Sequence, residues 1–309
     1  MAVMKASHLC AMLCLGLLAA LLPAASQADA GDGPSLTRIR DTGVIVAGYR
    51  PSSPPFAYLD ARLQPIGYSV ELCERVIAAL KTGLNLPGLE TKWVAVSSAT
   101  RMPLVANGAL DLECGITTHN AERARSQGFS LTMYVAQTRL LSRRADPILS
   151  LDDLRGKPIV STIGTTSIQY LHELNEREDA GLHILAGLDD PEAFRILQAG
   201  RAAAYMMDDV LLRSLQMQQA DPAEYVISDK PLTVEPYAIG LSKRDPAFKK
   251  RVDEVLLGLY RNGEIRRIYQ RWFESPIPPL GVNLKMPMSA AFKRIVEQPT
   301  DSADPARYR

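Results

Sequence analysis

Short apolar runs and amphipathic segments alternate along the chain from about residue 43. Runs rich in β-branched residues predict strands, and segments whose apolar residues recur every three or four positions predict helices. In the first half this pattern gives strand, helix, strand, helix and strand, at "GVIVAGY" (43–49), "YSVELCERVIAALK" (68–81), "ETKWVAVSS" (90–98), "TRMPLVANGAL" (100–110) and "LDLECGI" (110–116).

A second alternating set begins near residue 147. Its strands are expected in "PIVST" (158–162), "GLHILAGL" (181–188) and "RAAAYMMDD" (201–209), with a helix after each of the first two. Asp190 is expected to cap the second of these helices, because Pro191 suits the first helical position. A long amphipathic stretch then divides into two helices at Gly263, and the polar tail after Gln298 is expected to be loose.

Alternating strands and helices predict an α/β protein with mostly parallel sheets flanked by helices. Two β-like segments, "SLTMYVAQTRLLSRR" (130–144) and "KPLTVEPYAIGLS" (230–242), separate the two sets. We expect two lobes joined by these two hinge strands, with a cleft between the lobes. The predicted organisation is a signal peptide (1–28), lobe 1 (36–137 and 239–285), lobe 2 with the hinge strands (138–238) and a C-terminal extension (286–309).

The N-terminus has the pattern of a secretory signal. An apolar run from Leu9 to Pro23 follows a segment with one lysine and no acid, and small residues come after it. The run is shorter than a bilayer-spanning helix needs, which favours cleavage and export to the periplasm over a retained anchor. The formal net charge of +1 has no basic excess for nucleic acid. No cofactor or metal is expected.

Cys73 and Cys114 are the two cysteines that remain after the predicted cleavage. An even pair in an oxidising compartment is typical of a disulfide. Plain burial of Cys114 is the alternative, and either reading disfavours a reactive thiol.

Polar side chains gather where the predicted strands end, the edge at which open α/β sheets bind ligands. They are hydroxyls, arginines and aspartates, a set that suits an amino acid. Arg123 and the helix start at Thr165 and Thr166 would hold an α-carboxylate. Asp208 and Thr118 would accept from an α-ammonium. Two further arginines, Arg50 and Arg101, would suit a carboxylate on the ligand's side chain.

The segments "GYRPSSPPFAY", "SSATRMPLVANGALDLECGITTHNAER", "STIGTTS" and "GEIRRIYQRWF" resemble the family 3 solute-binding proteins of polar amino-acid ABC transporters, most of all the glutamate/aspartate branch. The resemblance covers about residues 36–279. It implies a periplasmic receptor that closes on glutamate or aspartate and delivers it to a membrane permease. It assigns the α-carboxylate to Arg123, Thr165 and Thr166, the ammonium to Asp208, Thr118 and the carbonyl of Ile116, and the side-chain carboxylate to Arg50, Arg101 and Ser98.

Asp190 departs from the branch that the chain resembles, which usually has a histidine there. If Asp190 only caps its helix, it turns away from the cleft. If it faces the ligand's distal carboxylate, it repels that group and favours an amide such as glutamine or asparagine.

Two other functions share this fold. An enzyme, for example a dehydratase, needs a base in the cleft. His119 is expected to face solvent, so no catalytic residue is assigned. A sensory binding domain is the third reading. The favoured interpretation is a monomeric binding protein for a small amino acid, with an ABC permease as its partner.

Overall fold

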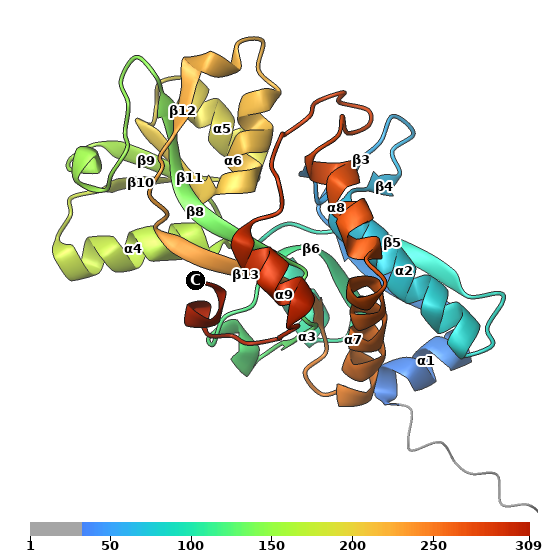
Figure 1. The fold of residues 1–309 in the computed structure, drawn as a ribbon. Helices are drawn as coiled ribbons and strands as arrows, with labels where there is room; N and C mark the ends of the chain where they lie inside the picture. Colours follow the sequence, from blue (N-terminus) through green and yellow to red (C-terminus); the bar gives the residue numbers. More distant parts are fainter. Residues whose placement is uncertain (1–32) are drawn as a thin grey trace, which may run out of the picture.

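Ten strands form one continuous mixed sheet in the computed structural model, which describes residues 33–309 (Figure 1). The predicted signal peptide lies outside these residues. The strands of this sheet are β1 (Val44–Tyr49), β5 (Glu90–Ala95), β6 (Leu112–Thr118), β7 (Gly128–Phe129), β8 (Tyr134–Arg143), β9 (Pro158–Thr162), β10 (His183–Gly187), β11 (Ala204–Asp208), β12 (Tyr225–Ile227) and β13 (Thr233–Leu241).

The order of the strands is β10-β9-β11-β8-β13-β6-β1-β5, with β12 on β8 and β7 on β13. Strands β5, β1 and β6 are parallel in lobe 1, and β10, β9 and β11 are parallel in lobe 2. The hinge strands β8 and β13 lie between these groups and pair antiparallel with each other and with both lobes. The two-lobed α/β fold is therefore confirmed.

Helices flank both groups of strands (Figure 1). Those of lobe 1 are α1 (Pro34–Thr42), α2 (Tyr68–Gly83), α3 (Arg101–Ala106), α7 (Pro246–Arg261) and α8 (Glu264–Phe273). Those of lobe 2 are α4 (Thr166–Glu178), α5 (Asp190–Gln198) and α6 (Asp209–Met217). Short 3₁₀ turns are η1 (Arg123–Arg125), η2 (Asp152–Leu154), η3 (Pro222–Glu224) and η4 (Pro305–Tyr308), and a small second sheet holds β2 (Ser52–Ser53), β3 (Ala57–Leu59) and β4 (Pro65–Ile66).

Aromatic side chains pack around the start of the hinge. Tyr134 on β8 and Tyr237 on β13 are register partners, and both rings contact Phe56. Tyr134 also stacks on Phe273 at the end of α8, with ring centroids 5.1 Å apart. Such pairs stabilise beyond the area that they bury. This cluster holds β13 in place, the strand from which the Tyr237 hydroxyl donates to Asp208 in the cleft.

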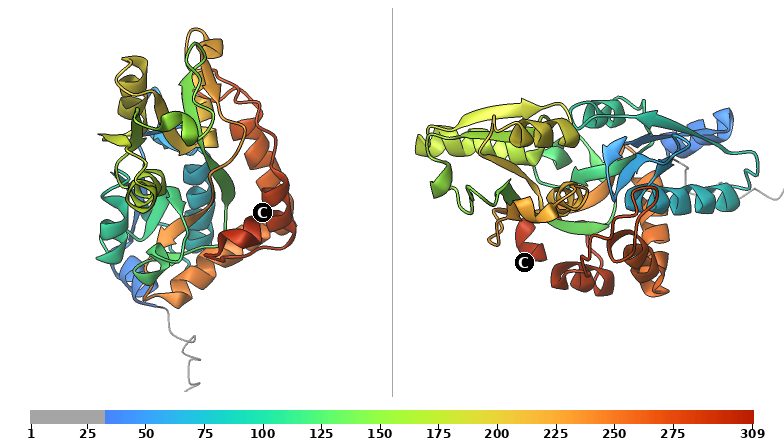
Figure 2. Two further views of the ribbon diagram at one scale, coloured as in Figure 1. Left: turned by 90° about the vertical axis from the view of Figure 1, so that its left-hand side faces the viewer. Right: turned by 90° about the horizontal axis from the view of Figure 1, so that it is seen from above.

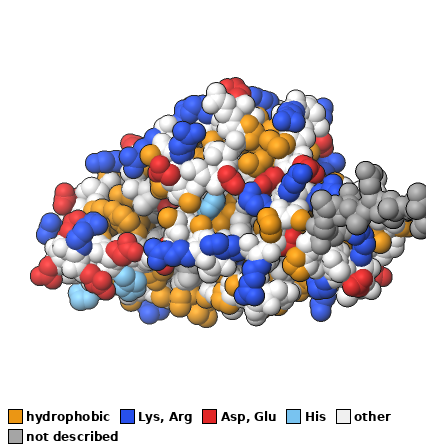
Figure 3. Space-filling view, turned by 90° about the horizontal axis from the view of Figure 1, so that it is seen from below, with side chains coloured by type: hydrophobic (Ala, Val, Ile, Leu, Met, Phe, Trp, Pro, Cys, Tyr) orange, Lys and Arg blue, Asp and Glu red, His pale blue; other side chains and the backbone are white. Residues whose placement is uncertain are grey.

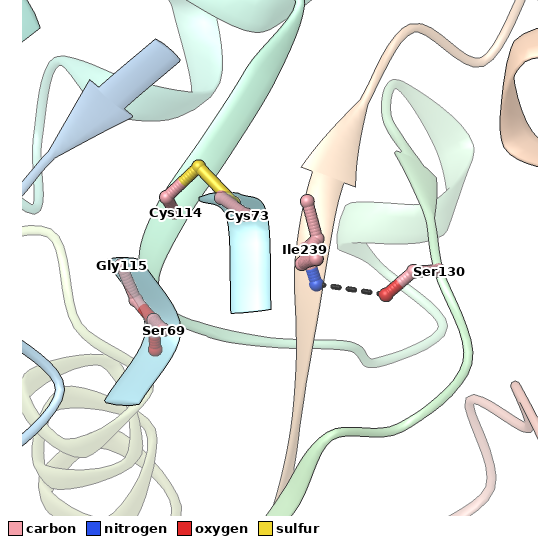
Figure 4. The surroundings of a disulfide bond; sticks show 6 residues. All are labelled: Ser69, Cys73, Cys114, Gly115, Ser130 and Ile239. Atoms are coloured by element: carbon pink, nitrogen blue, oxygen red, sulfur yellow. Dashed lines mark hydrogen bonds between the residues drawn. A yellow bond between two sulfur atoms is a disulfide. The ribbon is translucent and has the colours of Figure 1, made fainter. Parts of the chain in front are cut away.

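A disulfide joins Cys73 on α2 to Cys114 on β6, with the two Cα atoms 6.1 Å apart (Figure 4). Both cysteines are fully buried, and the predicted pairing is confirmed. One turn earlier on α2, the Ser69 hydroxyl donates to the Gly115 carbonyl at 2.7 Å. Helix and strand are thus fastened at two adjacent points beside the cleft.

The tail after Gln298 is ordered, so the expectation of a loose tail is wrong. It follows α9 (Ala290–Glu297), and the C-terminal helices lie along one side of the molecule (Figure 2). Tyr308 is buried, its hydroxyl lies 2.8 Å from Thr132 Oγ1, and the Thr132 N–H donates to the Thr300 carbonyl. The aromatic side chain of Tyr308 and these hydrogen bonds anchor an otherwise polar tail.

Helix α6 was absent from the sequence-based expectations, which extended a strand through Asp209. The strand ends at Asp208, and Asp209 is the first residue of the helix. Asp209 accepts from the Gln137 N–H of β8 at 3.2 Å, so it holds the helix start against the hinge.

We predict that removing the disulfide lowers the free energy of unfolding by about 2–4 kcal/mol, because the unfolded chain gains freedom when the loop opens. Urea unfolding of the oxidised protein and of the Cys73→Ala/Cys114→Ala variant measures this difference. A reductant should destabilise the first protein and leave the second unchanged. Equal stability of both proteins would contradict the prediction.

Candidate functional site

The side chains expected to bind a ligand lie at the carboxyl ends of the strands or at the first turn of the following helix, on the two facing lobes. In lobe 1 they are Arg50 after β1, Ser98 after β5, Arg101 at the start of α3, Ile116 and Thr118 on β6, and Arg123 in η1. In lobe 2 they are Thr165 and Thr166 at the start of α4, Asp190 at the start of α5 and Asp208 at the end of β11.

Arg101 and Arg123 are buried cations without an acidic partner. Neither guanidinium has a carboxylate within 4.0 Å among residues 33–309, although their side chains are 2% and 8% exposed. Arg101 donates from Nε to Thr117 Oγ1, and its buried Nη1 has no partner among the described residues. Burial, together with the nearby charges of Arg123 and Arg50, lowers the pKa of Arg101 to about 9. Two such groups would be stabilised by bound anions.

Arg123 reaches across the cleft. Its guanidinium donates to the Thr118 carbonyl at 3.2 Å in lobe 1 and to the Gly164 carbonyl at 3.4 Å in lobe 2. Both acceptors are neutral, and the carboxylates that act most strongly on this charge, those of Glu235 and Asp208, form no ion pair with it within 4.0 Å. The Arg123 side chain therefore touches both walls of the cleft.

Asp190 faces the cleft. It is 2% exposed, and its carboxylate accepts from Ser53 of lobe 1 and Thr162 of lobe 2, each at 2.8 Å. Arg50 Nη2 lies 3.6 Å from the same carboxylate, and Arg50 also donates to Ser98. The helix is capped instead by Asp189, which accepts from the Glu192 N–H at 2.8 Å. The prediction that Asp190 caps this helix is therefore wrong, because the cap is the preceding residue, Asp189.

The two helix-start threonines have different partners. The Thr165 hydroxyl caps α4 by accepting from the Ile168 N–H at 3.2 Å, and it donates to the Thr162 carbonyl. The Thr166 hydroxyl donates to Glu235 at 2.8 Å. The hydroxyls are thus occupied, and what this turn offers an anion is its unpaired backbone N–H groups.

Asp208 lies opposite Arg123 with a second carboxylate beside it. It accepts from Thr138 at 3.0 Å and from the Tyr237 hydroxyl. Burial and the charge of Glu235 raise the pKa of Asp208 to about 8. Glu235 was not predicted as a site residue, although a charge inside the apolar segment "TVEPYAIGL" was a usable signal.

Glu113 is another buried carboxylate that the sequence reading missed. It lies on β6, a strand that is buried at every position, and neither of its carboxylate oxygens has a hydrogen-bond partner among the described residues. Burial raises the pKa of Glu113, whereas the charge of Arg101 lowers it. The signal was again a charged residue in an apolar run, "LECGI".

His119 is buried at 7% exposure, so the prediction that it faces solvent is wrong. Its ring stacks on Phe129 with centroids 4.3 Å apart, and burial lowers its pKa. It lines a cavity of about 240 Å³ with Gln127 and Lys249, on the side of the hinge where the C-terminal tail packs.

The lobes are closed on each other at Gly164. A side chain there would place its Cβ 2.7 Å from the Ala99 nitrogen and 2.8 Å from the Ser98 carbonyl carbon, both in lobe 1. Gln169 and Glu122 also bridge the lobes, at 2.7 Å. The arginines and aspartates of the site are therefore shielded from water, which strengthens each charge interaction.

The surface has no single-sign patch on the face that Figure 3 shows, where basic and acidic side chains are interspersed. No described helix has the length and apolar character to cross a membrane.

A closed, two-lobed α/β protein with a buried polar cleft has the architecture of a solute-binding protein. The sequence pattern of the bacterial extracellular solute-binding proteins, family 3, matches residues 45–275, and the chain belongs to this family. This assignment agrees with the prediction of a binding protein rather than an enzyme.

Two relatives match over nearly their whole length. The L-glutamate/L-aspartate-binding protein of Pseudomonas aeruginosa is 43% identical over 293 residues, covering 94% of this chain and 97% of the relative. The glutamate/aspartate import solute-binding protein of Escherichia coli K12 is 39% identical, covering 95% and 97%.

Solved structures share the fold at lower identity. A mutant of ArgBP from T. maritima superposes with a TM-score of 0.70 at 24% identity, covering 78% of this chain and all of that one. An ancestral arginine-binding protein bound to arginine has a TM-score of 0.68 at 24% identity, covering 75% and 98%.

We predict that Gly164→Ala weakens ligand binding at least about 100-fold, because the added Cβ would clash with Ala99 of lobe 1 and oppose closure, in addition to the backbone strain at its φ of +75°. Gly156→Ala is the matched control, since Gly156 has a φ of +70° with nothing within 4 Å of the added carbon. Calorimetric titration measures affinity, and thermal unfolding measures the strain that both variants share. Equal affinity in the two variants would show that the contact does not limit closure.

Proposed function

We propose that the protein captures an acidic amino acid, L-glutamate or L-aspartate, by closing its lobes on it. The observation that carries this proposal is the pair of buried arginines, Arg101 and Arg123, that have no carboxylate within 4.0 Å in the described chain. A dicarboxylic amino acid supplies two carboxylates, one for each. The names of the relatives from P. aeruginosa and E. coli support the same ligand class.

In this proposal the α-carboxylate binds Arg123 and the N–H groups at Thr165 and Thr166, where the start of α4 adds a favourable dipole. The α-ammonium binds Asp208, the Thr118 hydroxyl and the Ile116 carbonyl. These groups come from both lobes and from a hinge-side strand end, so one ligand stabilises the closed form.

The distal carboxylate is assigned to Arg101, with Arg50 and Ser98 behind it. Arg50 already faces Asp190 and donates to Ser98, so its charge is partly neutralised. Arg101 therefore carries most of the preference for an acid. The same Asp190 ion pair supports glutamine or asparagine as the alternative ligand, because an amide would not be repelled by this carboxylate.

We infer that the protein delivers the amino acid to an ABC permease; the name of the E. coli relative, an import solute-binding protein, supports a role in uptake. We infer that the protein acts in the periplasm as a monomer, with the two lobes presenting their outer faces to the permease. No bond is made or broken in this role.

We predict that Arg123→Ala abolishes binding of every amino acid, whereas Arg101→Ala weakens glutamate and aspartate far more than glutamine and asparagine. The first removes a partner of the shared α-carboxylate, and the second removes the distal charge, a loss of about 2–5 kcal/mol. Calorimetric titration with these four amino acids is the test. Arg155→Ala, at an exposed side chain in lobe 2, is the control. Tight binding of the amides with none of the acids by the unmodified protein would overturn the proposal.

A further prediction concerns Asp190. Asp190→Asn should raise the ratio of glutamate affinity to glutamine affinity about tenfold or more, because it removes a buried negative charge next to the distal subsite. Asp189→Asn, at the half-buried capping position, should leave the ratio unchanged. An unchanged ratio in both variants would mean that Asp190 does not face the distal group of the ligand.

A further inference from the structure

A chain of hydrogen bonds connects Asp208 to Glu235 through two threonines of the hinge strands. Thr138 on β8 donates to Asp208 at 3.0 Å, and the hydroxyls of Thr138 and Thr233 are 2.7 Å apart. Thr233, on β13 opposite Thr138, also contacts Glu235 Oε1. Tyr237 donates to the far oxygen of Asp208, and Thr166 donates to the far oxygen of Glu235.

This chain of hydrogen bonds has one contact more than its hydroxyl groups have protons to donate. Its five contacts are Tyr237–Asp208, Asp208–Thr138, Thr138–Thr233, Thr233–Glu235 and Glu235–Thr166, and its four hydroxyls supply four protons. A hydroxyl has a single proton to donate, and an ionised carboxylate has none. If Thr233 donates to Thr138, its contact with Glu235 lacks a proton; if it donates to Glu235, its contact with Thr138 lacks one.

One added proton completes the chain. Placed on Glu235, it gives every contact a donor, because Glu235 then donates to Thr233, Thr233 to Thr138 and Thr138 to Asp208. We propose that the ligand-free protein holds one shared proton on the Asp208–Glu235 pair, and that the α-ammonium of the amino acid replaces it. Binding would then release one proton to solvent: protonated protein plus amino acid gives the complex plus H⁺. This inference rests on the proposed function, because it uses the same ammonium position.

The charges around the pair favour this exchange. Asp208 faces Tyr237 from β13, Tyr205 from β11, Asp209 from α6 and Arg123 from η1. Arg123 is attracted most by Glu235 and Asp208 and also by Glu113 and Glu122, so one cation faces four carboxylates and does not compensate two full negative charges on the pair. Two close carboxylates of this kind normally keep one proton. The α-ammonium supplies the positive charge that the proton supplied before.

The pair does not depend on closure for its geometry. Asp208, Glu235, Thr138 and Thr233 lie on β11 and on the two hinge strands, and Thr166 starts α4 of lobe 2. Opening the lobes separates lobe 1 from this group without dividing it. The chain of hydrogen bonds is therefore intact in the form that first meets the ligand, and Glu235 is a positioning residue that acts through Asp208.

The sign of the pH dependence follows from linkage. A proton that only the ligand-free protein holds must leave on binding, so affinity rises with pH until the free protein loses the proton by itself. Burial and Glu235 raise the pKa of Asp208 to about 8. The apparent affinity should then increase about tenfold per pH unit from pH 6 to 7.5 and level off above pH 8.

The test is calorimetric titration of the full mature protein with L-glutamate, at pH 6 and pH 8, in buffers of different ionisation enthalpy. The slope of the observed enthalpy against buffer enthalpy counts the protons released. We expect about one proton at pH 6 and about half a proton at pH 8. Glu235→Gln, whose amide supplies the missing donor, should bind glutamate and release close to none.

Two further proteins complete the design. Thr233→Val leaves three contacts with three protons, so it should also lower the release if Glu235→Gln fails to fold. Glu178→Gln, at an exposed glutamate of α4, should match the unmodified protein. Glutamate binding with no proton release at pH 6, or with equal release in Glu235→Gln, would overturn the inference and leave the proposed function intact. No binding of glutamate or aspartate by the unmodified protein would overturn the proposed function itself.

Discussion

Burial of three guanidinium groups between two lobes is the constraint on which this structure depends. Taking a charge out of water is costly unless it is paired. Arg50 is paired with Asp190 of the opposite lobe, while Arg101 and Arg123 donate to neutral oxygens and have no acid within 4.0 Å in the described chain. The Arg50–Asp190 ion pair thus stabilises the closed form in part. The charges of Arg101 and Arg123 would be stabilised by a bound anion.

Contacts outside the group of buried arginines keep these charges in place. The disulfide and the Ser69–Gly115 hydrogen bond fasten α2 to β6, the strand that carries Thr118. The aromatic cluster around Phe56 supports the β8–β13 pair, from which Thr138 and Tyr237 reach Asp208. In this closed form the lobes are joined by the two hinge strands and by side-chain contacts such as Ser53–Asp190 and Glu122–Gln169.

The sequence predicted the architecture well because its signals are local. Strand and helix periods, and an even pair of cysteines, gave the lobes, the hinge strands and the disulfide. It was less reliable where a residue's role depends on a distant partner. Asp190 was read as a cap, whereas Asp189 caps and Asp190 meets Ser53 from the other lobe. Glu113 and Glu235 were not predicted, because the role of a charged residue in a strand cannot be inferred until the cation or hydroxyl that faces it in the fold is known.

The bridge between Glu122 and Gln169 offers a way to observe the protein at work. It joins the lobes at the cleft rim, at 2.7 Å, so the two positions must separate when the lobes open. Cys73 and Cys114 are joined in a disulfide. A cysteine introduced in place of Glu122 or Gln169 would therefore carry the reactive thiol in the described part of the chain. A dye attached at this rim would convert lobe movement into an optical signal, and the same architecture would then serve as a sensor for its solute.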